Sequence, residues 1–348
     1  MDFVGLIDWY EAAHRELPWR ETQDPYRIWL SEVILQQTRV AQGWAYYTRF
    51  VDRFPTVREL AAAEEDEVLK LWQGLGYYSR ARNLHAAAKQ VEERYGGLFP
   101  TTYEEVRGLR GVGDYTAAAI VSFAVDAPYA VVDGNVYRVL SRVLDVETPI
   151  DSTAGKREFT VAAEALLAEY LALPGNRGAG IYNQAMMELG ALVCTPRGAQ
   201  CEACPLRGNC LARQHATVEE RPVKRGKTTQ KPRYFNYLHI VDRFGRTVIR
   251  RRDGEDIWRG LYEFPLIETS VEAEFETLAI PVSGWVWEGA VRMPKHVLSH
   301  RVIHATFHRL TVADLSRMAL PEGWMVVPAE RLGEYAVARL TELYLERA

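Results

Sequence analysis

The arrangement of its four cysteines limits the possible folds of this 348-residue chain more than any other feature. Cys194, Cys201, Cys204 and Cys210 follow the spacing C-x6-C-x2-C-x5-C, and the chain has no other cysteine. Four cysteines are too few for a disulfide scaffold of this length, whereas four thiolates in one loop can wrap a single metal centre. Soft sulfur ligands suit tetrahedral zinc or an iron–sulfur cluster, and ligand chemistry alone does not choose between them.

Composition excludes several other classes of protein. An apolar fraction of 48% and a charged fraction of 25% are ordinary for globular proteins. The sequence has no run of 18 apolar residues, so we expect no membrane-spanning helix. The amino terminus has no basic segment followed by an apolar one, so we expect no signal peptide and a reducing, cytoplasmic setting. A net charge of −4 neither requires nor excludes nucleic acid, because binding depends on local charge.

Residues 1–215 carry helix signals and no convincing strand alternation. Asp24 followed by Pro25 is typical of a helix start, and the pattern predicts one helix to about Phe54. Thr56 and Glu59 fit a capping box before an alanine-rich stretch. We therefore expect a mainly α amino-terminal part.

The pattern changes after the last cysteine. Residues 207–233 hold eight basic residues against two glutamates, which predicts an exposed basic linker over 216–232. This linker is either a solvated tether or a contact to the DNA backbone. Residues 234–241 and 246–249 then predict a β-hairpin, so an α+β domain is expected over 233–348.

A glycine-containing turn precedes a predicted helix at residues 109–117. Gly111 and Gly113, on either side of Val112, permit a tight turn whose backbone N–H groups face outward, and the helix begins at Asp114. Such N–H groups can hold a DNA phosphate without reading sequence. A bare G-x-G turn is common, so this motif indicates DNA binding only together with others.

Two carboxylates are candidate catalytic groups. Glu32 has the mainly apolar neighbours Trp29 and Leu35 on its helix face, so burial would raise its pKa and suit it to donate a proton. The alternative is a surface glutamate at a helix edge. Asp133 precedes a helix and is either a simple N-cap or an ionised partner of the neutral acid. A neutral and an ionised carboxyl group together cleave glycosides through an oxocarbenium-like transition state.

These motifs, in their order along the chain, resemble the MutY family of adenine DNA glycosylases within the endonuclease III superfamily. The resemblance spans about residues 18–210 and rests on segments 18–20, 31–38, 74–78, 109–117, 132–135 and the cysteine loop. It implies a helix-hairpin-helix barrel over about 21–127 and a cluster lobe formed by 1–20 and about 128–215. It also implies one 4Fe–4S cluster on the four cysteines.

The resemblance further implies the reaction and the partner. The expected activity is hydrolysis of the N-glycosidic bond of adenine opposite 8-oxoguanine or guanine, after the adenine is flipped out of the duplex. The expected partner is double-stranded DNA with that mispair, bound by a monomer in the bacterial cytoplasm at the nucleoid.

Site residues follow from the same resemblance. Glu32 would protonate adenine with support from Tyr115, while Asp133, oriented by Asn135, would stabilise the sugar cation. Trp19 and Arg20 would belong to the adenine pocket. The residues expected to contact the lesion or the DNA are Gln37, Thr38, Leu75, Tyr77, Gly111, Val112, Gly113, Ser299 and His300.

The second domain resembles Nudix pyrophosphohydrolases without their metal site. Segment 258–265 is similar to the one before the Nudix box, but 266–272 lacks the glycine pair and the run of glutamates that holds magnesium. Metal-dependent hydrolysis is therefore not expected, and the resemblance to the MutY family implies that this Nudix-like domain recognises 8-oxoguanine on the opposite strand. Leu298-Ser299-His300 resembles the Phe-Ser-His loop of the MutY family, and serine can accept the N7–H that distinguishes 8-oxoguanine from guanine.

Two alternatives remain at this point. One is an endonuclease III-like glycosylase and lyase for oxidised pyrimidines, whose relatives carry a Schiff-base lysine two residues after the second glycine of the hairpin. This chain has Tyr115 there, which cannot form an imine, so lyase activity should be weak or absent. The other is a non-catalytic, damage-binding iron–sulfur protein, against which the pairing of Glu32 with Asp133 argues.

Overall fold

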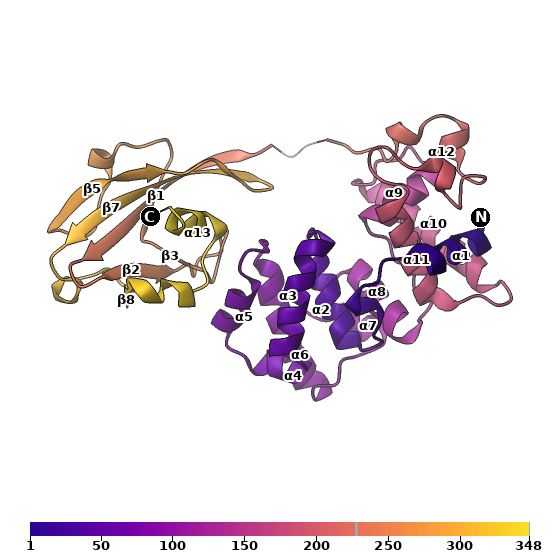
Figure 1. Ribbon diagram of the computed structural model, residues 1–348, viewed down its shortest axis with the longest axis horizontal. Helices are drawn as coiled ribbons and strands as arrows, with labels where there is room; N and C mark the ends of the chain where they lie inside the picture. The colour runs from indigo at the N-terminus through magenta and orange to yellow at the C-terminus, as the bar shows by residue number, and fades with distance from the viewer. Residues whose placement is uncertain (227–228, 348) are drawn as a thin grey trace. The chain divides into compact units, whose positions relative to one another are not determined.

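The computed structural model describes residues 1–226 and 229–347 (Figure 1). The chain divides into two compact units: Met1–Ala61 with Ala86–Gly226, called the helical unit, and Ala62–His85 with Lys227–Ala348, called the sheet unit. Residues 62–85 thus group with the carboxy-terminal half, although they belong to the helical part of the sequence. No helix among the described residues is long and apolar enough to cross a membrane.

Residues 1–226 form helices and, where the structure describes them, no strand. The α-helices are α1 (Phe3–Ala13), α2 (Pro25–Leu35), α3 (Val40–Arg53), α4 (Val57–Ala62), α5 (Glu65–Trp72), α6 (Ser79–Tyr95), α7 (Tyr103–Arg107), α8 (Asp114–Val125), α9 (Gly134–Val143), α10 (Thr153–Leu171), α11 (Gly178–Leu192) and α12 (Leu211–Gln214). Short 3-10 turns include η1 (Pro18–Arg20). Of these elements, α5 and the start of α6 lie in the sheet unit.

The predicted helix starts are confirmed, but the predicted length of the first long helix is wrong. The Asp24 side chain accepts from the Tyr26 N–H at 2.9 Å, and Glu59 Oε2 accepts from the Thr56 N–H at 2.9 Å. The helix that begins at Pro25 ends at Leu35 rather than near Phe54. Gln37 has a φ of 55°, a left-handed conformation that an α-helix cannot contain, and α3 starts after it.

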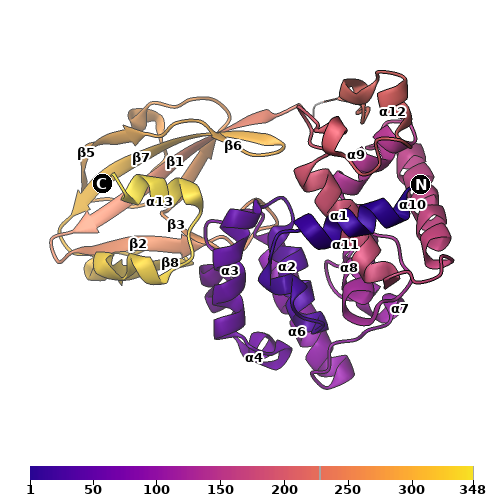
Figure 2. The ribbon, with the colours of Figure 1, turned by 45° about the vertical axis from the view of Figure 1, so that its right-hand side comes forward.

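The core of the helical unit fixes the framework of the site. Buried side chains of α1, α9, α10 and α11 form one cluster, and these helices lie together in Figures 1 and 2. Helix α11 packs against α1, α8, α9 and α10, while α2 packs against α3 and α8. The start of α8, the start of α9, α2 and α11 therefore have fixed places around a common space.

The sheet unit is an α+β domain, as predicted. Its strands are β1 (Lys231–Asp242), β2 (Arg246–Arg251), β3 (Tyr262–Glu263), β4 (Leu266–Thr269), β5 (Trp285–Arg292), β6 (His296–Val297), β7 (Arg301–Val312) and β8 (Trp324–Pro328). The main order is β3-β2-β1-β7-β5, with β1 and β7 parallel over their whole length and the other pairs antiparallel. Helix α13 (Arg339–Leu345) covers one face, where the Tyr344 ring stacks on Phe307 at 4.0 Å.

The predicted hairpin of β1 and β2 is confirmed. The Asp242 carboxylate accepts from the backbone N–H groups of Phe244 and Arg246 at 3.0 Å each, and Gly245 takes a φ of 72°. A residue with a side chain would be strained at this glycine. The turn chemistry that the sequence suggested therefore sets the register of the first two strands.

The predicted basic linker is only partly exposed. Arg221 is 5% exposed and pairs with Asp145 at 2.9 Å and Glu147 at 2.8 Å. The Val223 carbonyl accepts from the Ile150 N–H at 3.0 Å. The prediction of exposure is therefore wrong for Arg221, whose charge is paired with carboxylates of the helical unit. Lys224 and Arg225 are exposed, and Lys227 lies outside the described residues.

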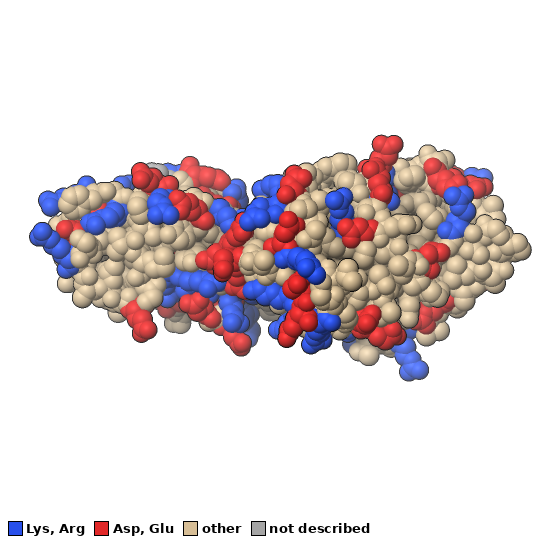
Figure 3. Space-filling view, turned by 90° about the horizontal axis from the view of Figure 1, so that it is seen from below, with Lys and Arg blue, Asp and Glu red and all other residues tan. Residues whose placement is uncertain are grey.

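Acidic and basic side chains are mixed on the one face of the molecule that Figure 3 draws. On the face drawn in Figure 3, lysines and arginines are interspersed with aspartates and glutamates. This agrees with the small net charge of −4. Nucleic-acid binding by this face would depend on local groups rather than on an extended positive field.

Candidate active site

A cavity of about 490 Å³ in the helical unit is lined by eight of the predicted site residues. It is lined by η1, α2, the residues after α2, and the starts of α8 and α9, with α11 on a further side. The predicted site residues along its wall are Trp19, Arg20, Glu32, Gln37, Thr38, Tyr115, Asp133 and Asn135. The volume is in the range of small-ligand sites.

Glu32 lies on the buried face of α2 and is 7% exposed, so the surface alternative is wrong. The Tyr115 hydroxyl donates to Glu32 Oε2 at 2.5 Å. Burial raises the pKa of Glu32 to about 7; the Tyr115 hydrogen bond opposes this rise, the nearby Asp133 carboxylate adds to it, and Arg20 opposes it. A carboxyl group with this pKa holds a proton in a large fraction of molecules at neutral pH, as a general acid requires.

Asp133 is both the N-cap of α9 and a wall of the cavity. Its carboxylate accepts from the Val136 N–H at 2.7 Å and from Asn135 Nδ2 at 2.8 Å. Burial raises the pKa of Asp133, whereas these hydrogen bonds and the Arg138 guanidinium oppose the rise. The expected pairing of Asn135 with Asp133 is present, and the N-cap interpretation is also correct.

Arg138 joins this capping residue to the cysteine loop. Its Nη2 donates to Asn135 Oδ1 at 2.8 Å and to the Gly190 carbonyl at 2.6 Å, and its Nε donates to the Cys194 carbonyl at 2.6 Å. Arg138 is 9% exposed. The start of α9, the end of α11 and the first cysteine are therefore held together by one side chain.

Glu188 on α11 is a site residue that the sequence analysis missed. It is 0% exposed and lines the same cavity, where Oε2 accepts from Arg20 Nη2 at 2.7 Å and from Arg15 Nη2 at 2.6 Å. Burial alone would raise its pKa, but the hydrogen bonds from the two arginines hold the pKa of Glu188 at about 2. A lone carboxylate in the otherwise apolar stretch 185–193 was the available signal.

Trp19 and Arg20 both reach the predicted pocket. Trp19 is 8% exposed and meets the Tyr47 ring edge-on at 5.3 Å. Arg20 Nη1 donates to the Arg15 carbonyl at 3.0 Å, in addition to its pairing with Glu188. The guanidinium is thus fixed by two groups, the Arg15 carbonyl and the Glu188 carboxylate, rather than free to follow a ligand.

The residues expected at the lesion fall in several places. Gln37 and Thr38 line the cavity that contains Glu32, although they were expected at the lesion rather than in the adenine pocket. Leu75 is 8% exposed, whereas Tyr77 is 51% exposed with a φ of 46°. Of Leu75 and Tyr77, only Tyr77 has a side chain that is exposed enough for a bound DNA to contact.

Ser299 and His300 are exposed in the turn between β6 and β7. Within the sheet unit, the hydroxyl groups of Ser299 and Tyr77 form a hydrogen bond at 2.8 Å. The three residues line a cavity of about 480 Å³ together with Trp258 and Leu298. Sequence motifs far apart in the chain therefore meet at one surface.

The glycine turn at 111–113 connects α7 and α8 as a helix-hairpin-helix. Gly111 has a φ of 77°, Val112 is buried, and Gly113 is the N-cap residue of α8. A side chain added at Gly113 would meet nothing within 4 Å. The backbone at the start of α8 is therefore open to a close approach by a phosphate group.

The four cysteines line one small cavity at the ends of α9 and α11, and none forms a disulfide. Arg142 Nη1 donates to Cys194 Sγ at 3.3 Å, and Arg207 and Arg213 lie in the same wall. In the described part of the chain, no group of three or more His, Cys, Asp or Glu side chains is arranged to hold a single metal ion. Four free thiols around one space, with guanidinium groups beside them, fit a group bound by thiolates.

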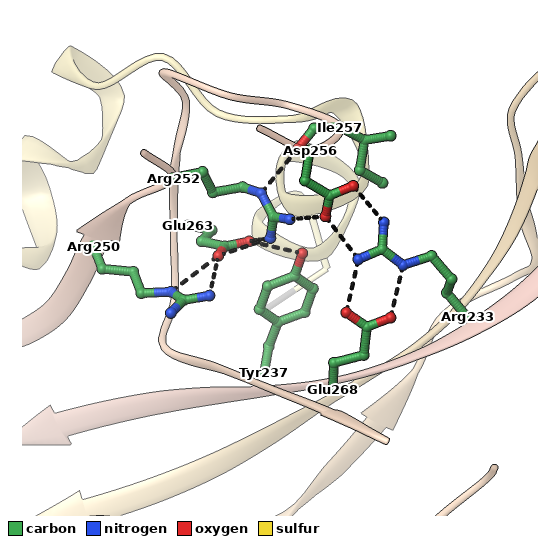
Figure 4. A network of polar contacts seen from close by, with 8 residues as sticks. All are labelled: Arg233, Tyr237, Arg250, Arg252, Asp256, Ile257, Glu263 and Glu268. Carbon is green, nitrogen blue, oxygen red and sulfur yellow. Dashed lines mark hydrogen bonds and ion pairs between the residues drawn. The ribbon is translucent and has the colours of Figure 1, made fainter. Parts of the chain in front are cut away.

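The Nudix-like segment 258–265 lies in a network of ion pairs (Figure 4). Glu263 is 2% exposed and accepts from Arg250 Nη2 and Arg252 Nη1 at 2.8 Å each, and from the Tyr237 hydroxyl at 3.1 Å. Arg233 pairs with two further carboxylates, Asp256 and Glu268, at 2.7 Å each. These carboxylates join strands β1 to β4 and are occupied by guanidinium groups.

Two family models match the chain. Residues 30–162 match the HhH-GPD superfamily of base excision DNA repair proteins, and residues 236–347 match the NUDIX domain. A solved thermostable thymine-DNA glycosylase shares 27% sequence identity and a TM-score of 0.55, covering 61% of this chain and 95% of that one. A non-covalent endonuclease III–DNA complex, 23% identical with a TM-score of 0.51 over 62% and 94% of the chains, supports the fold. The class is thus a helix-hairpin-helix DNA glycosylase with a Nudix-like domain.

Curated relatives define the family more narrowly. An adenine DNA glycosylase of Buchnera aphidicola subsp. Acyrthosiphon pisum is 30% identical over 77% of this chain and 75% of its own length. The human adenine DNA glycosylase is 43% identical over 62% of this chain, but the match spans only 40% of the human protein. The chain belongs to the adenine DNA glycosylase family, so the predicted family and fold class are confirmed.

Proposed function

We propose that the protein hydrolyses the N-glycosidic bond of adenine opposite 8-oxoguanine or guanine in double-stranded DNA, as a monomeric, monofunctional enzyme of the bacterial cytoplasm. The observation that carries this proposal is the cavity in which Glu32, with a pKa near 7, shares a wall with Asp133. Two carboxyl groups in different environments are the usual equipment for glycoside cleavage.

Glu32 is the general acid of this mechanism. Its proton goes to N7 of the flipped adenine, which makes the base a better leaving group. Tyr115 holds the Glu32 carboxyl group by the 2.5 Å hydrogen bond, so the donating oxygen has a fixed direction. Because burial raises its pKa to about 7, the group holds its proton in a large fraction of molecules at neutral pH.

Asp133 acts on the sugar. As the carbon–nitrogen bond lengthens, positive charge develops on the deoxyribose, and an ionised carboxylate beside C1′ stabilises it or attacks it transiently. The Val136 N–H and Asn135 Nδ2 favour the ionised form of Asp133 and fix its orientation. Water then completes the hydrolysis, and no amine is required.

Tyr115 supports the monofunctional assignment. Strand cleavage by related lyases needs a lysine amine that forms an imine with the sugar, and a phenol cannot do this. In this chain the position is occupied by a side chain whose hydroxyl group is engaged by Glu32.

Recognition of 8-oxoguanine is assigned to Ser299 and His300, with Tyr77 beside them. The support is the exposed turn between β6 and β7 and the 2.8 Å hydrogen bond between Ser299 and Tyr77. A serine hydroxyl can accept from the N7–H of 8-oxoguanine, whereas N7 of guanine can only accept. An exposed tyrosine can fill or stack in the space that base flipping leaves.

One 4Fe–4S cluster is assigned to Cys194, Cys201, Cys204 and Cys210. When bound, it would join four points of one loop and so stabilise residues 194–210. The support is the convergence of four free thiols on one cavity and the guanidinium groups around it. In this assignment the cluster has a structural role, and the residues that act on adenine are those of the cavity that contains Glu32.

Incubation with defined duplexes tests the function. Duplexes carry adenine opposite 8-oxoguanine, adenine opposite guanine, or thymine glycol, and products are resolved with and without alkali. We expect strand breaks only after alkali and only in the adenine duplexes. Breaks without alkali would indicate a lyase, action on thymine glycol would indicate the pyrimidine enzyme, and binding without excision would indicate a damage-binding protein.

A further inference from the structure

The wall of the active cavity contains a charge triad built around a buried carboxylate. Glu188 on α11 is fully buried and accepts from Arg15 Nε at 2.8 Å, Arg15 Nη2 at 2.6 Å and Arg20 Nη2 at 2.7 Å. The Arg15 backbone N–H adds a bond at 2.9 Å. One carboxylate therefore takes four hydrogen bonds from two arginines, which leaves the triad with one net positive charge.

The triad matters for catalysis because Arg20 acts on two carboxyl groups. Arg20 is one of the groups that oppose the protonated state of Glu32, and it is also bound to Glu188. The charged and titratable groups that face Glu32 are Tyr115 of α8, Asp133 at the start of α9 and Arg20 of η1. Those that face Glu188 are Arg15, Arg20 and Tyr10 of α1.

We propose that Glu188 is a positioning residue that fixes Arg20 in the cavity wall and offsets its positive charge, so that Glu32 stays protonated at neutral pH. This inference rests on the proposed role of Glu32 as general acid. Without the negative charge of Glu188, the two guanidinium groups would face the cavity unbalanced and would favour ionised Glu32. With it, the positive charge that Glu32 meets is reduced while Arg20 keeps its place.

The position of the alkaline limb in the pH profile of adenine excision measures this effect. Single-turnover rates are recorded from pH 5.5 to 9 with the full-length protein at saturating concentration on the adenine·8-oxoguanine duplex. We expect Glu188→Gln to move the limb down by about one pH unit, which makes excision about tenfold slower above the limb. At the acidic end of the range the rate should approach that of the wild type.

Arg15→Gln should move the limb in the opposite direction, by about half a unit, because it removes one positive charge. Its side chain is 36% exposed, so this variant should fold even if Glu188→Gln does not. The double variant Arg15→Gln/Glu188→Gln restores the net charge of the triad and should return the limb close to its original pH. If the role of Glu188 were only structural, the double variant would instead be less stable and less active than either single variant.

The control removes a carboxylate from an exposed ion pair of the same helical unit. Glu11 pairs with Arg177 at 2.9 Å, and both side chains are well exposed, so Glu11→Gln should leave the limb in place. A limb that does not move in Arg15→Gln and Glu188→Gln, with rates lowered equally at all pH values, overturns the positioning role. If Glu32→Gln itself keeps normal excision, the proposed general acid fails instead, and the two failures are distinguishable.

Discussion

Glu32, the proposed general acid, is a carboxyl group buried in the helical unit, and burial raises its pKa to about 7. Glu32→Gln keeps the shape and can still accept from Tyr115, but it has no acidic proton. We expect single-turnover adenine excision to fall by about 10²–10⁴-fold. A rate within a few-fold of the wild type, in protein that binds the duplex normally, would remove Glu32 from this role.

The same residue should make stability depend on pH. The pKa of Glu32 rises from 4.5 to about 7 on folding, so the folded state binds the proton more tightly than the unfolded state. Its contribution is fully present below pH 4.5 and is lost as the pH rises through 7. The loss amounts to about 3 kcal/mol for a shift of this size.

Urea denaturation of the wild type and Glu32→Gln at pH 5 and pH 8 checks this dependence. The variant lacks the titrating carboxyl group at position 32. As the pH increases, the unfolding free energy of the wild type should therefore fall relative to that of the variant. An equal difference at both pH values would show that burial does not control the ionisation of Glu32.

Sequence could predict Glu32 but not its surroundings. The apolar residues one turn away on the same helix were sufficient to suggest burial. The apolar stretch around Glu188 could likewise suggest burial, but not its partners Arg15 and Arg20, which lie 173 and 168 positions away in the chain. Charge pairing across such separations depends on the tertiary fold, which the local pattern does not contain.

At the scale of a single helix, Asp133 can be tested separately as a cap and as a catalyst. Asparagine is as good an N-cap as aspartate, so Asp133→Asn should leave α9 and DNA binding intact. Loss of the negative charge should lower excision by about 10²–10³-fold, the range for electrostatic stabilisers. A variant that unfolds, measured by circular dichroism, would favour the N-cap role of Asp133 over the catalytic one.

The cysteine loop allows a second prediction at this scale. Purified protein should be brown and contain iron, and Cys204→Ser should lose iron and make residues 194–210 more sensitive to proteases. Absorbance, metal analysis and limited proteolysis measure these properties. Zinc at one per chain with no iron would contradict the cluster assignment.

Local signals placed helix and hairpin starts but not every helix end. The caps at Asp24 and Thr56 and the turn at Asp242 depend on neighbouring residues, and these were predictable. The break after Leu35 was not, because the left-handed φ of Gln37 is imposed where the chain turns between packed helices. The pairing of β1 with β7 was also out of reach, since sequence patterns do not specify which distant strands meet.

For the molecule as a whole, the preference for 8-oxoguanine should be separable from the chemistry. Ser299 and His300 lie in the sheet unit, whereas Glu32 and Asp133 lie in the helical unit. Replacement of both Ser299 and His300 by alanine should reduce the preference for adenine opposite 8-oxoguanine over adenine opposite guanine. The bond-breaking step itself should be retained, because its carboxyl groups are untouched.

Competition between the two duplexes for the same enzyme gives the preference directly. Tyr77→Ala serves as a companion variant, since its hydroxyl group bonds to Ser299, and it should lower the preference in the same direction. Unchanged discrimination in the Ser299 and His300 variant would assign recognition of the lesion to other residues.

The parallel pairing of β1 with β7 also has a consequence for biosynthesis. Lys231 pairs with Arg301, and the two strands stay in register to Asp242 and Val312, so the centre of the sheet is assembled from segments made at different times. Non-local pairing of this kind is slow, because a long loop must close before any contact forms. A ribosome that has released β1 but not yet β7 therefore exposes an unpaired strand edge. During that interval we expect the nascent chain to be open to pairing with other chains along this edge.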